Sequence, residues 1–343
     1  MNVKLKRLLM TVFLLMIICI FSVFSKNAVK GAVCGITLCL THIVPSLFPF
    51  LIIAEMICNY SFSQGSFIYS LLVGNISGYP IGGKLCSSLN LTGRKRFLSL
   101  IACIGAGPGF TVAAVGTGVL KSQSAGVLLF ASQILTSLTA AAVFFLLGRE
   151  KKEKQRRDLF LEDIKPFGTV LTDSVTAACL SCLYICGFVT FFSCIIGIGE
   201  VLIGNGLCGM IIGGILEVSN GCGRASLVYG LLGFSFLGFI LGFGGLCVLC
   251  QIWTFVRKYG ITFKELLLSR LVSGLLGFIY SALLYISFPC FIPTASFDTH
   301  LNKTALHPIS LTVTLCIMLG VLLCADKRTG GVRIFGDKGR CDT

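Results

Sequence analysis

The sequence predicts an all-α protein that crosses a membrane several times. Of its 343 residues, 55% are hydrophobic and only 12% are charged, whereas soluble domains carry about 25% charged residues. The 40 glycines and eight prolines suit helices that pack closely or break inside a membrane. These observations exclude an ordinary water-soluble enzyme.

The charge of the chain also indicates a membrane protein. Lysine and arginine outnumber aspartate and glutamate by 28 to 14, but the basic residues lie between apolar stretches instead of on one amphipathic face. Cytoplasmic loops of membrane proteins retain lysine and arginine in this way. The expected partner is therefore the lipid bilayer, and nucleic acid is not expected as a partner.

The first apolar stretch covers residues 8–25 and follows Lys4, Lys6 and Arg7. A basic start and an apolar centre also occur in signal peptides, but residues 26–31 offer no clean cleavage site. Residues 1–26 are therefore predicted to form an uncleaved transmembrane helix whose N-terminus is cytoplasmic.

Further apolar segments follow along the chain, and one basic loop separates them into two comparable halves. The segments are 29–58, 66–93, 97–120, 125–148, 167–203, 207–222, 227–256, 266–290 and 308–325. The loop, residues 149–166, has seven basic residues and is predicted to be cytoplasmic. The two halves, 27–148 and 167–290, are expected to be repeats. Residues 291–325 should hold an extracytoplasmic loop and a last helix, and the basic tail 326–343 should be cytoplasmic.

Several of these segments are expected to bend or break. Pro45 and Pro49 interrupt the first, Gly74–Gly83 the second, and Gly105-Ala-Gly-Pro-Gly109 the third. Irregular backbone at membrane depth is tolerated where it lines a cavity or is buried in protein. The Gly105–Gly109 stretch is interpreted as unwound chain beside such a cavity, because it follows no strand and so is not a dinucleotide-binding motif.

A glycine-broken piece stands ahead of a basic turn in each half. The pieces are residues 78–86 and 242–251. Broken segments at matching positions of two halves are typical of secondary transporters and point to the binding site. The Gly78–Lys84 and Gly242–Gln251 segments are therefore predicted to face one another near the midplane.

The first candidate site residues are the glycine break and the lysine that follows it. Backbone N–H groups at a half-helix N-terminus and an ammonium group beside them suit an anion. The predicted substrate-binding residues here are Gly78, Tyr79, Pro80, Gly82, Gly83 and Lys84. In the alternative, Lys84 extends to the membrane interface or pairs with Glu55.

The second half contributes a carboxylate with polar neighbours. Its predicted binding residues are Glu217, Ser219, Asn220, Gly244, Gly245 and Gln251. The carboxylate, hydroxyl and amide suit a coupling cation or proton, or polar atoms of a substrate. In the alternative, these residues cap a short helix.

No catalytic, metal or cofactor site is expected. The sequence has no paired histidine and aspartate set for an intramembrane enzyme. The C-x-x-C pairs Cys179/Cys182 and Cys247/Cys250 lie in apolar runs without nearby histidine. They are interpreted as packing residues.

Three motifs together resemble a known family. They are Ser77-Gly-Tyr-Pro-Ile-Gly-Gly-Lys84, Leu216-Glu-Val-Ser-Asn-Gly221 and Leu241-Gly-Phe-Gly-Gly-Leu-Cys-Val-Leu-Cys-Gln251. The chain resembles sporulation integral membrane proteins of the YlbJ type, in the nucleoside-recognition (gate) domain superfamily, over residues 30–290.

The resemblance implies two gate repeats, inverted and with re-entrant helices, similar to concentrative nucleoside transporters. It also implies a place in the outer forespore membrane of a bacterium, moving dipicolinic acid from the mother cell towards the spore. The expected function is transport of a small organic anion, with dipicolinate preferred. The alternatives are a nucleoside or other metabolite as substrate, or a membrane scaffold for spore assembly that transports nothing.

Overall fold

The computed structural model describes residues 3–60, 66–147, 165–203, 207–228 and 230–288. These residues form helices and connecting turns, and no strand occurs among them. Within this part of the chain, six helical stretches are long and apolar enough to cross a membrane. They are Val3–Val23, Ser25–Tyr60, Gln123–Leu146, Phe167–Val201, Gly230–Tyr259 and Phe263–Ser287. The prediction of an all-α chain with several membrane spans is therefore confirmed.

Some predicted segments fall outside the described residues. They are most of the basic loop 149–166, nearly all of the segment 291–325 assigned to a loop and a last helix, and the tail 326–343. Their predicted positions relative to the membrane stay predictions.

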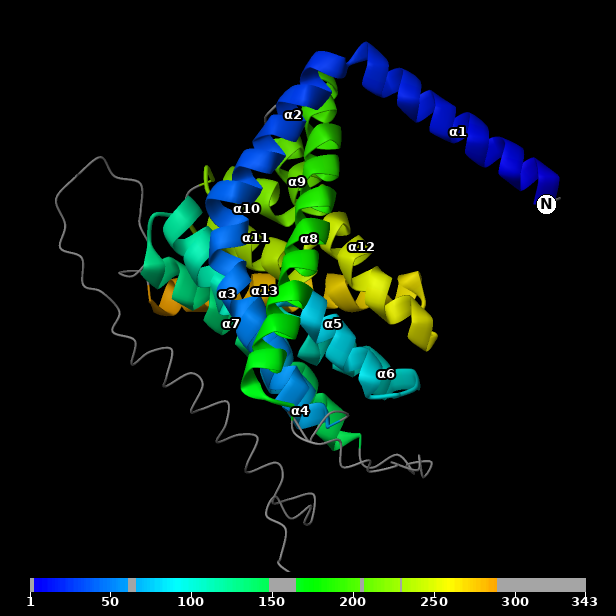
Figure 1. Cartoon of the computed structure of the whole chain (residues 1–343). Coiled ribbons are helices and arrows are strands. Elements are labelled where there is room, and N and C mark those ends of the chain that lie inside the picture. The colour runs from blue at the N-terminus through cyan, green and yellow to red at the C-terminus, as the bar shows by residue number, and fades with distance from the viewer. Residues whose placement is uncertain (1–2, 61–65, 148–164, 204–206, 229, 289–343) are drawn as a thin grey trace, which may run out of the picture.

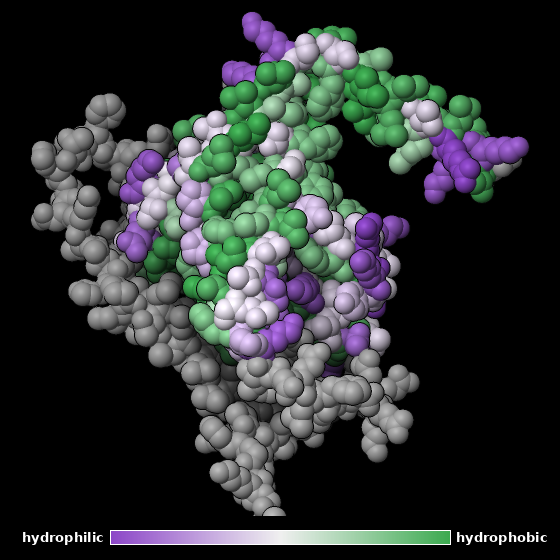
Figure 2. Space-filling model, viewed as in Figure 1, coloured by the Kyte–Doolittle hydropathy of each residue, from purple (hydrophilic) through white to green (hydrophobic). Residues whose placement is uncertain are grey.

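Helix α1 (Val3–Val23) projects away from the other helices, and none of its residues is buried (Figure 1). Its surface is hydrophobic along most of its length and hydrophilic at its N-terminal end (Figure 2). A helix with so apolar a surface and so little protein around it suits a lipid environment.

Two very long helical stretches pack side by side (Figure 1). The first runs through α2 (Ser25–Leu38), the π-helical turn η1 (Cys39–Ile43) and α3 (Val44–Tyr60), and the second is α8 (Phe167–Ile203). A methyl group added at Gly35 would lie 2.8 Å from the Ser193 Oγ. Glycine thus lets the two backbones approach closely.

The first of these stretches stays helical through both prolines. The expected distortion takes the form of η1, which ends two residues before Pro45. A π-helical turn lets a long helix bend without being interrupted.

Four other helices of the described residues are broken. They are α4/α5 (Phe67–Ser77, Tyr79–Ser88), α6/η2 (Gly93–Cys103, Gly109–Val119), α9/α10 (Leu207–Leu216, Val218–Ala225) and α11/α12 (Gly230–Phe243, Gly245–Val256). Gly78 and Gly244 have φ of 90° and 83°, a region that favours glycine. The breaks predicted near these glycines and within Gly105–Gly109 are confirmed.

The helices follow the same order in both halves of the chain. Each half has a long helical stretch, two broken helices and one unbroken helix, α7 (Gln123–Leu146) or α13 (Phe263–Ser287). By this order the break at Gly78 corresponds to the one at Glu217, and the break at 104–107 to the one at Gly244. The glycine-broken pieces 78–86 and 242–251 thus occupy different places in this order, the first in the first broken helix of its half and the second in the second.

The breaks expose backbone carbonyl groups, and buried side chains donate hydrogen bonds to several of them. The Asn75 amide donates to the Ala102 carbonyl at 2.8 Å, and the Tyr79 hydroxyl donates to the Leu241 carbonyl at 2.5 Å. Arg270 on α13 donates to the carbonyls of Ile104 and Gly242, the latter at 2.9 Å. Such partners satisfy backbone groups that a break would otherwise leave unpaired in an apolar interior.

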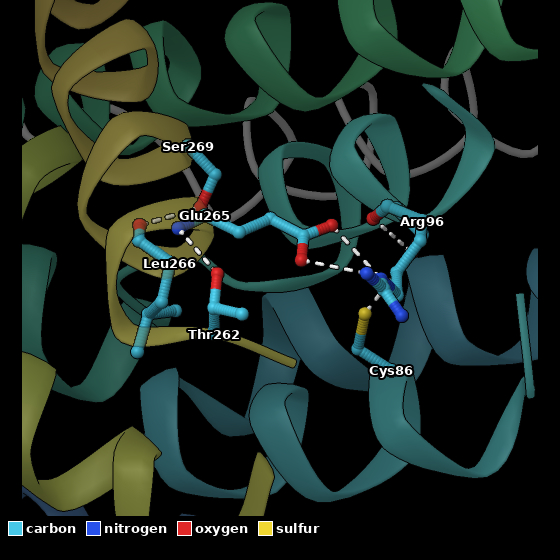
Figure 3. Close-up of polar contacts among 7 residues, drawn as sticks. Cys86, Arg96, Thr262, Glu265, Leu266 and Ser269 are labelled. Carbon is cyan, nitrogen blue, oxygen red and sulfur yellow. Dashed lines mark hydrogen bonds and ion pairs between the residues drawn. The ribbon is translucent and has the colours of Figure 1, made fainter. Parts of the chain in front are cut away.

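An ion pair also joins the two halves. Arg96 near the start of α6 faces Glu265 in the first turn of α13 (Figure 3). Two parallel contacts of 2.8 Å form between the guanidinium and the carboxylate. Thr262 caps the same helix end by accepting from the Glu265 N–H at 3.2 Å. This bidentate arrangement fixes α6 relative to α13.

Glycine packing between α11 and α13 gives a first testable prediction. A methyl group added at Gly238 would lie 2.5 Å from the Gly277 carbonyl. Gly238→Val should therefore force the helices apart and lower the melting temperature in detergent by several degrees, because overpacking costs about 1–3 kcal/mol. Gly199→Val is the control, since no atom lies within 4 Å of a methyl group there. Equal melting temperatures for the two variants would contradict the close contact.

Candidate functional site

A cavity lies where the helix breaks meet. Its lining comes from the breaks of α4/α5, α6/η2 and α9/α10, and from α12, η1, α3 and α8. The lining residues are Ile43, Leu47, Leu51, Ser77, Gly78, Tyr79, Pro80, Gly107, Phe110, Ile185, Val189, Glu217, Val218, Ser219, Val248 and Gln251. The volume of the cavity is about 40 Å³, below the roughly 300–1,000 Å³ of small-molecule sites, so a bound solute requires the helices around the cavity to move apart.

The structure brings half of the predicted site residues to this cavity. Those that line it are Gly78, Tyr79, Pro80, Glu217, Ser219 and Gln251. The other six do not line it: Gly82, Gly83, Lys84, Asn220, Gly244 and Gly245. The two predicted segments are nevertheless neighbours, since α5 packs against α12.

The glycines outside the lining serve the packing of the breaks. Methyl groups added at Gly82 and Gly83 would meet the Cys103 carbonyl at 2.5 Å and the Ile252 side chain at 2.9 Å. Gly244 lies against the Tyr79 ring, and Gly245 lies against the backbone at Glu217. They therefore hold the lining residues in place without contacting the cavity.

Glu217 fits both interpretations given by the sequence. Its carboxylate caps α10 by accepting from the Ser219 N–H at 2.9 Å and the Asn220 N–H at 2.7 Å. It also accepts from the Asn220 side-chain amide at 2.8 Å. The residue is fully buried and lines the cavity. The cap thus holds a carboxylate group at the cavity wall.

Asn220 acts behind this carboxylate. Its amide also donates to the Ser193 hydroxyl on α8 at 2.9 Å. The contact ties the cap to the long helix and orients the carboxylate from outside the cavity.

Two polar side chains in the lining have spare hydrogen-bonding capacity. The Ser219 Oγ is buried, lies beside the Glu217 carboxylate and makes no hydrogen bond of good geometry in the described part of the chain. The Gln251 amide donates to the Cys247 Sγ at 3.4 Å, and sulfur is a weak acceptor. Both groups are available to a bound solute.

Lys84 has a partner of its own. Its ammonium lies 3.1 Å from the Glu55 carboxylate, the pairing that was one of the two sequence alternatives. The lysine side chain is 53% exposed, whereas that of Glu55 is 10% exposed. The pair therefore lies at the protein surface of α5 and α3, outside the cavity lining.

Sequence reasoning missed Arg270, the largest fully buried side chain among the described residues. Its guanidinium bridges the breaks of α6/η2 and α11/α12, and its Nε has no partner there. Arg270 lies six positions after Lys264, so the sequence suggests that it belongs to the basic turn before it. Only its place within an apolar helical run signals burial.

The helix ends that line the cavity give it a mixed electrostatic character. Its lining includes the first residues of α5, η2 and α10, whose N-termini carry partial positive charge. Carbonyl groups at the ends of α6 and α11 are engaged by Asn75, Tyr79 and Arg270. The lining thus combines the electropositive N-terminal ends of α5 and η2 with the Glu217 carboxylate, which caps α10, and with Ser77 at the electronegative C-terminal end of α4.

The cysteines form no described site. Cys182 and Cys247 are buried, Cys179 is exposed and Cys250 is partly buried, and all four are free thiols. No group of three or more histidine, cysteine or acidic side chains that could hold a metal occurs among the described residues.

Comparisons with known proteins identify one informative relative. No protein-family model matches the chain, and no solved structure matches it. The chain is 23% identical to the sporulation integral membrane protein YlbJ of Bacillus subtilis (strain 168), over 82% of this chain and 83% of that protein. The resemblance to proteins of the YlbJ type is thereby confirmed. Together with the six apolar helical stretches of the described residues, it identifies a multi-pass integral membrane protein.

Proposed function

We propose that this protein transports a small organic anion during endospore formation, and that the anion is dipicolinate moving from the mother cell across the outer forespore membrane. The place in sporulation follows the similarity to YlbJ, which is a sporulation integral membrane protein. The observation that carries the transport proposal is the cavity between the helix breaks. Broken helices around a cavity are typical of secondary transporters.

The preference for an anion rests on the half-helix ends. The first turns of α5, η2 and α10 contribute to the lining. Each helix N-terminus is equivalent to roughly half a positive charge. Glu217 already places a carboxylate against one of them with three N–H donors. A planar dicarboxylate would use the same kind of contact at the other ends, with Ser219 and Gln251 as further donors.

A neutral nucleoside or similar metabolite is the second candidate, and a specific observation favours it. No lysine or arginine side chain lines the cavity in the described part of the chain, whereas the Glu217 carboxylate does. An acidic and amide lining suits the hydroxyl and ring N–H groups of a nucleoside. In either case Glu217 is the proposed site of a coupling proton or cation.

Transport by purified protein in vesicles tests the proposal. Labelled dipicolinate and labelled uridine are offered separately to vesicles with and without the protein. We expect protein-dependent movement of dipicolinate. Movement of uridine alone would support the second candidate, and movement of neither would favour a scaffold. Spores of a deletion strain with dipicolinate synthesis intact in the mother cell should then contain little dipicolinate.

The Lys84–Glu55 pair gives a prediction about where the anion is recognised. Lys84→Ala alone should reduce transport several-fold, because it leaves the largely buried Glu55 carboxylate without its cation. The double variant Lys84→Ala/Glu55→Gln should recover most of the activity at matched protein levels. Failure of the double variant to recover would instead assign the ammonium a direct role in binding the anion.

A further inference from the structure

Two basic turns of the chain are held together at one end of the helices. The first basic turn, residues 89–96, links α5 to the start of α6, and the second basic turn, residues 257–264, links α12 to the start of α13. The bidentate Arg96–Glu265 pair fastens the start of α6 to the start of α13 (Figure 3). The two turns are therefore neighbours, although they belong to different halves of the chain.

The half-helices that precede these turns also run side by side. Gly244 at the start of α12 lies against the ring of Tyr79 at the start of α5. A methyl group added at Gly83 on α5 would lie 2.9 Å from the Ile252 side chain and 3.8 Å from that of Val256, the last residue of α12. Helices α5 and α12 thus run in parallel from the helix breaks to the two basic turns (Figure 1).

This end of the helices lies at a membrane face. The second basic turn joins two of the stretches that are long and apolar enough to cross a membrane, Gly230–Tyr259 and Phe263–Ser287. A turn between consecutive spans stands at the face where one span ends and the next begins. The first basic turn stands at the same face, because the ion pair and the parallel half-helices hold it there. The lysine and arginine excess of both turns indicates that this face is cytoplasmic.

The exposed cations of the two turns form a patch that we call the basic face. It consists of Arg94, Arg257, Lys258 and Lys264. None of these four forms an ion pair with another described residue. The acidic residue directly after the second turn, Glu265, is already engaged by Arg96. The basic face therefore has an uncompensated positive charge, which favours an anionic partner.

Aromatic side chains beside the basic face indicate what kind of anion this partner is. The rings of Trp253 and Phe263 pack edge to face with their centroids 5.5 Å apart. Trp253 is only partly buried, and Tyr259 is 53% exposed. Tryptophan and tyrosine are enriched at the level of the lipid headgroups, where basic clusters attract anionic lipids. The combination favours a phospholipid headgroup.

We propose that the basic face binds the phosphate groups of anionic phospholipids, such as phosphatidylglycerol, in the cytoplasmic leaflet. The guanidinium groups of Arg94 and Arg257 can each donate two parallel N–H bonds to a phosphate, and the two lysines add positive charge. Lipid bound across both turns joins the two halves of the chain. It also anchors the outer ends of α5 and α12, whose inner ends lie at the helix breaks.

Titration of the full-length protein with lipid in detergent tests the proposal. The melting temperature is followed as phosphatidylglycerol or zwitterionic phosphatidylcholine is added. We expect phosphatidylglycerol to stabilise the wild type at much lower concentration than phosphatidylcholine. Arg257→Gln/Lys258→Gln should raise the phosphatidylglycerol concentration for half-maximal stabilisation about ten-fold or more, because each cation near an anionic surface contributes roughly five-fold. Without added lipid its melting temperature should match that of the wild type, since both side chains are exposed.

Lys26→Gln/Lys30→Gln is the matched control, because it removes two exposed lysines from the start of α2. Its response to phosphatidylglycerol should equal that of the wild type. A wild-type response in Arg257→Gln/Lys258→Gln, or equal losses in the two double variants, would overturn the proposal. Stabilisation by inorganic phosphate at the same concentrations would also overturn it, because the basic face would then be a site for free anions.

Labelling in membranes tests whether the two turns share one face. Thr92→Cys and Tyr259→Cys are introduced separately into a chain whose native cysteines are replaced. Both positions are exposed, and both should react with a membrane-impermeant maleimide only from the cytoplasmic side. Labelling of the two positions from opposite sides, or of both from the outside, would contradict the proposal.

Discussion

Replacing Arg270 with methionine should remove most of the folded protein recovered from membranes. The guanidinium donates to the carbonyls of Ile104 and Gly242, and Arg270 is 1% exposed. Methionine fills similar space but donates no hydrogen bond. Each buried carbonyl left unpaired costs about 1–3 kcal/mol, and domains are stable by only about 5–15 kcal/mol. The measurement is the monodisperse fraction after size-exclusion chromatography in detergent, followed by thermal unfolding.

Two further variants show which property of Arg270 matters. Arg270→Lys keeps the charge but cannot span both carbonyls with a planar fork, so it should give an intermediate melting temperature. Arg257→Met removes an exposed arginine of the turn Arg257–Tyr259 and should have little effect. If Arg270→Met unfolds at the wild-type temperature, the bridge between the breaks contributes no stability.

Glu217→Ala should abolish solute transport. The change removes the carboxylate from the cavity wall and three hydrogen bonds to Ser219 and Asn220. Loss of such a cap costs about 0.5–2 kcal/mol, so part of the protein should still fold. The transport rate per folded molecule, measured in vesicles, should fall to the level of vesicles without protein. The first turn of α10 would lose its cap.

Glu217→Gln separates the cap from the charge. The glutamine carbonyl oxygen can still accept from one backbone N–H, so folding should be close to normal. Transport by this variant should lose its dependence on a coupling proton or cation, because the titratable group is gone. Asp173→Asn on the exposed surface of α8 is the control. Unchanged transport and unchanged coupling in Glu217→Gln would remove Glu217 from the proposed mechanism.

The positions of the helices could be predicted from the sequence, because the length of an apolar stretch and the positions of its glycines and prolines are local properties. The predicted stretch 167–203 coincides with α8, and the breaks lie at Gly78, Gly244 and 104–107 as expected. Gly78 in particular has the positive φ that only glycine adopts easily. These features depend on a few neighbouring residues, and the sequence contains them directly.

The residues of the binding site were harder to predict from the sequence, because the site depends on which residues lie close together in the folded protein. Lys84 is adjacent to the glycine break in sequence, yet its side chain points to Glu55. Phe110 is one apolar residue among many in the sequence, and only the way the helix breaks meet places it in the cavity lining. Arg270 bridges carbonyls 166 and 28 residues away along the chain. No local pattern records contacts at such separations.

The partners of the broken helices have a consequence for biosynthesis. The Ile104 carbonyl in the first half receives its hydrogen bond from Arg270 in the second, while the Leu241 carbonyl in the second half receives its own from Tyr79 in the first. A ribosome that has made only the first half has inserted a break whose donor does not yet exist. Until α13 is translated, the Ile104 carbonyl of that half needs another hydrogen-bond donor, which water, a lipid headgroup or an insertion chaperone can supply. Two separately synthesised halves would each be degraded alone, and should persist only when both are made in the same cell.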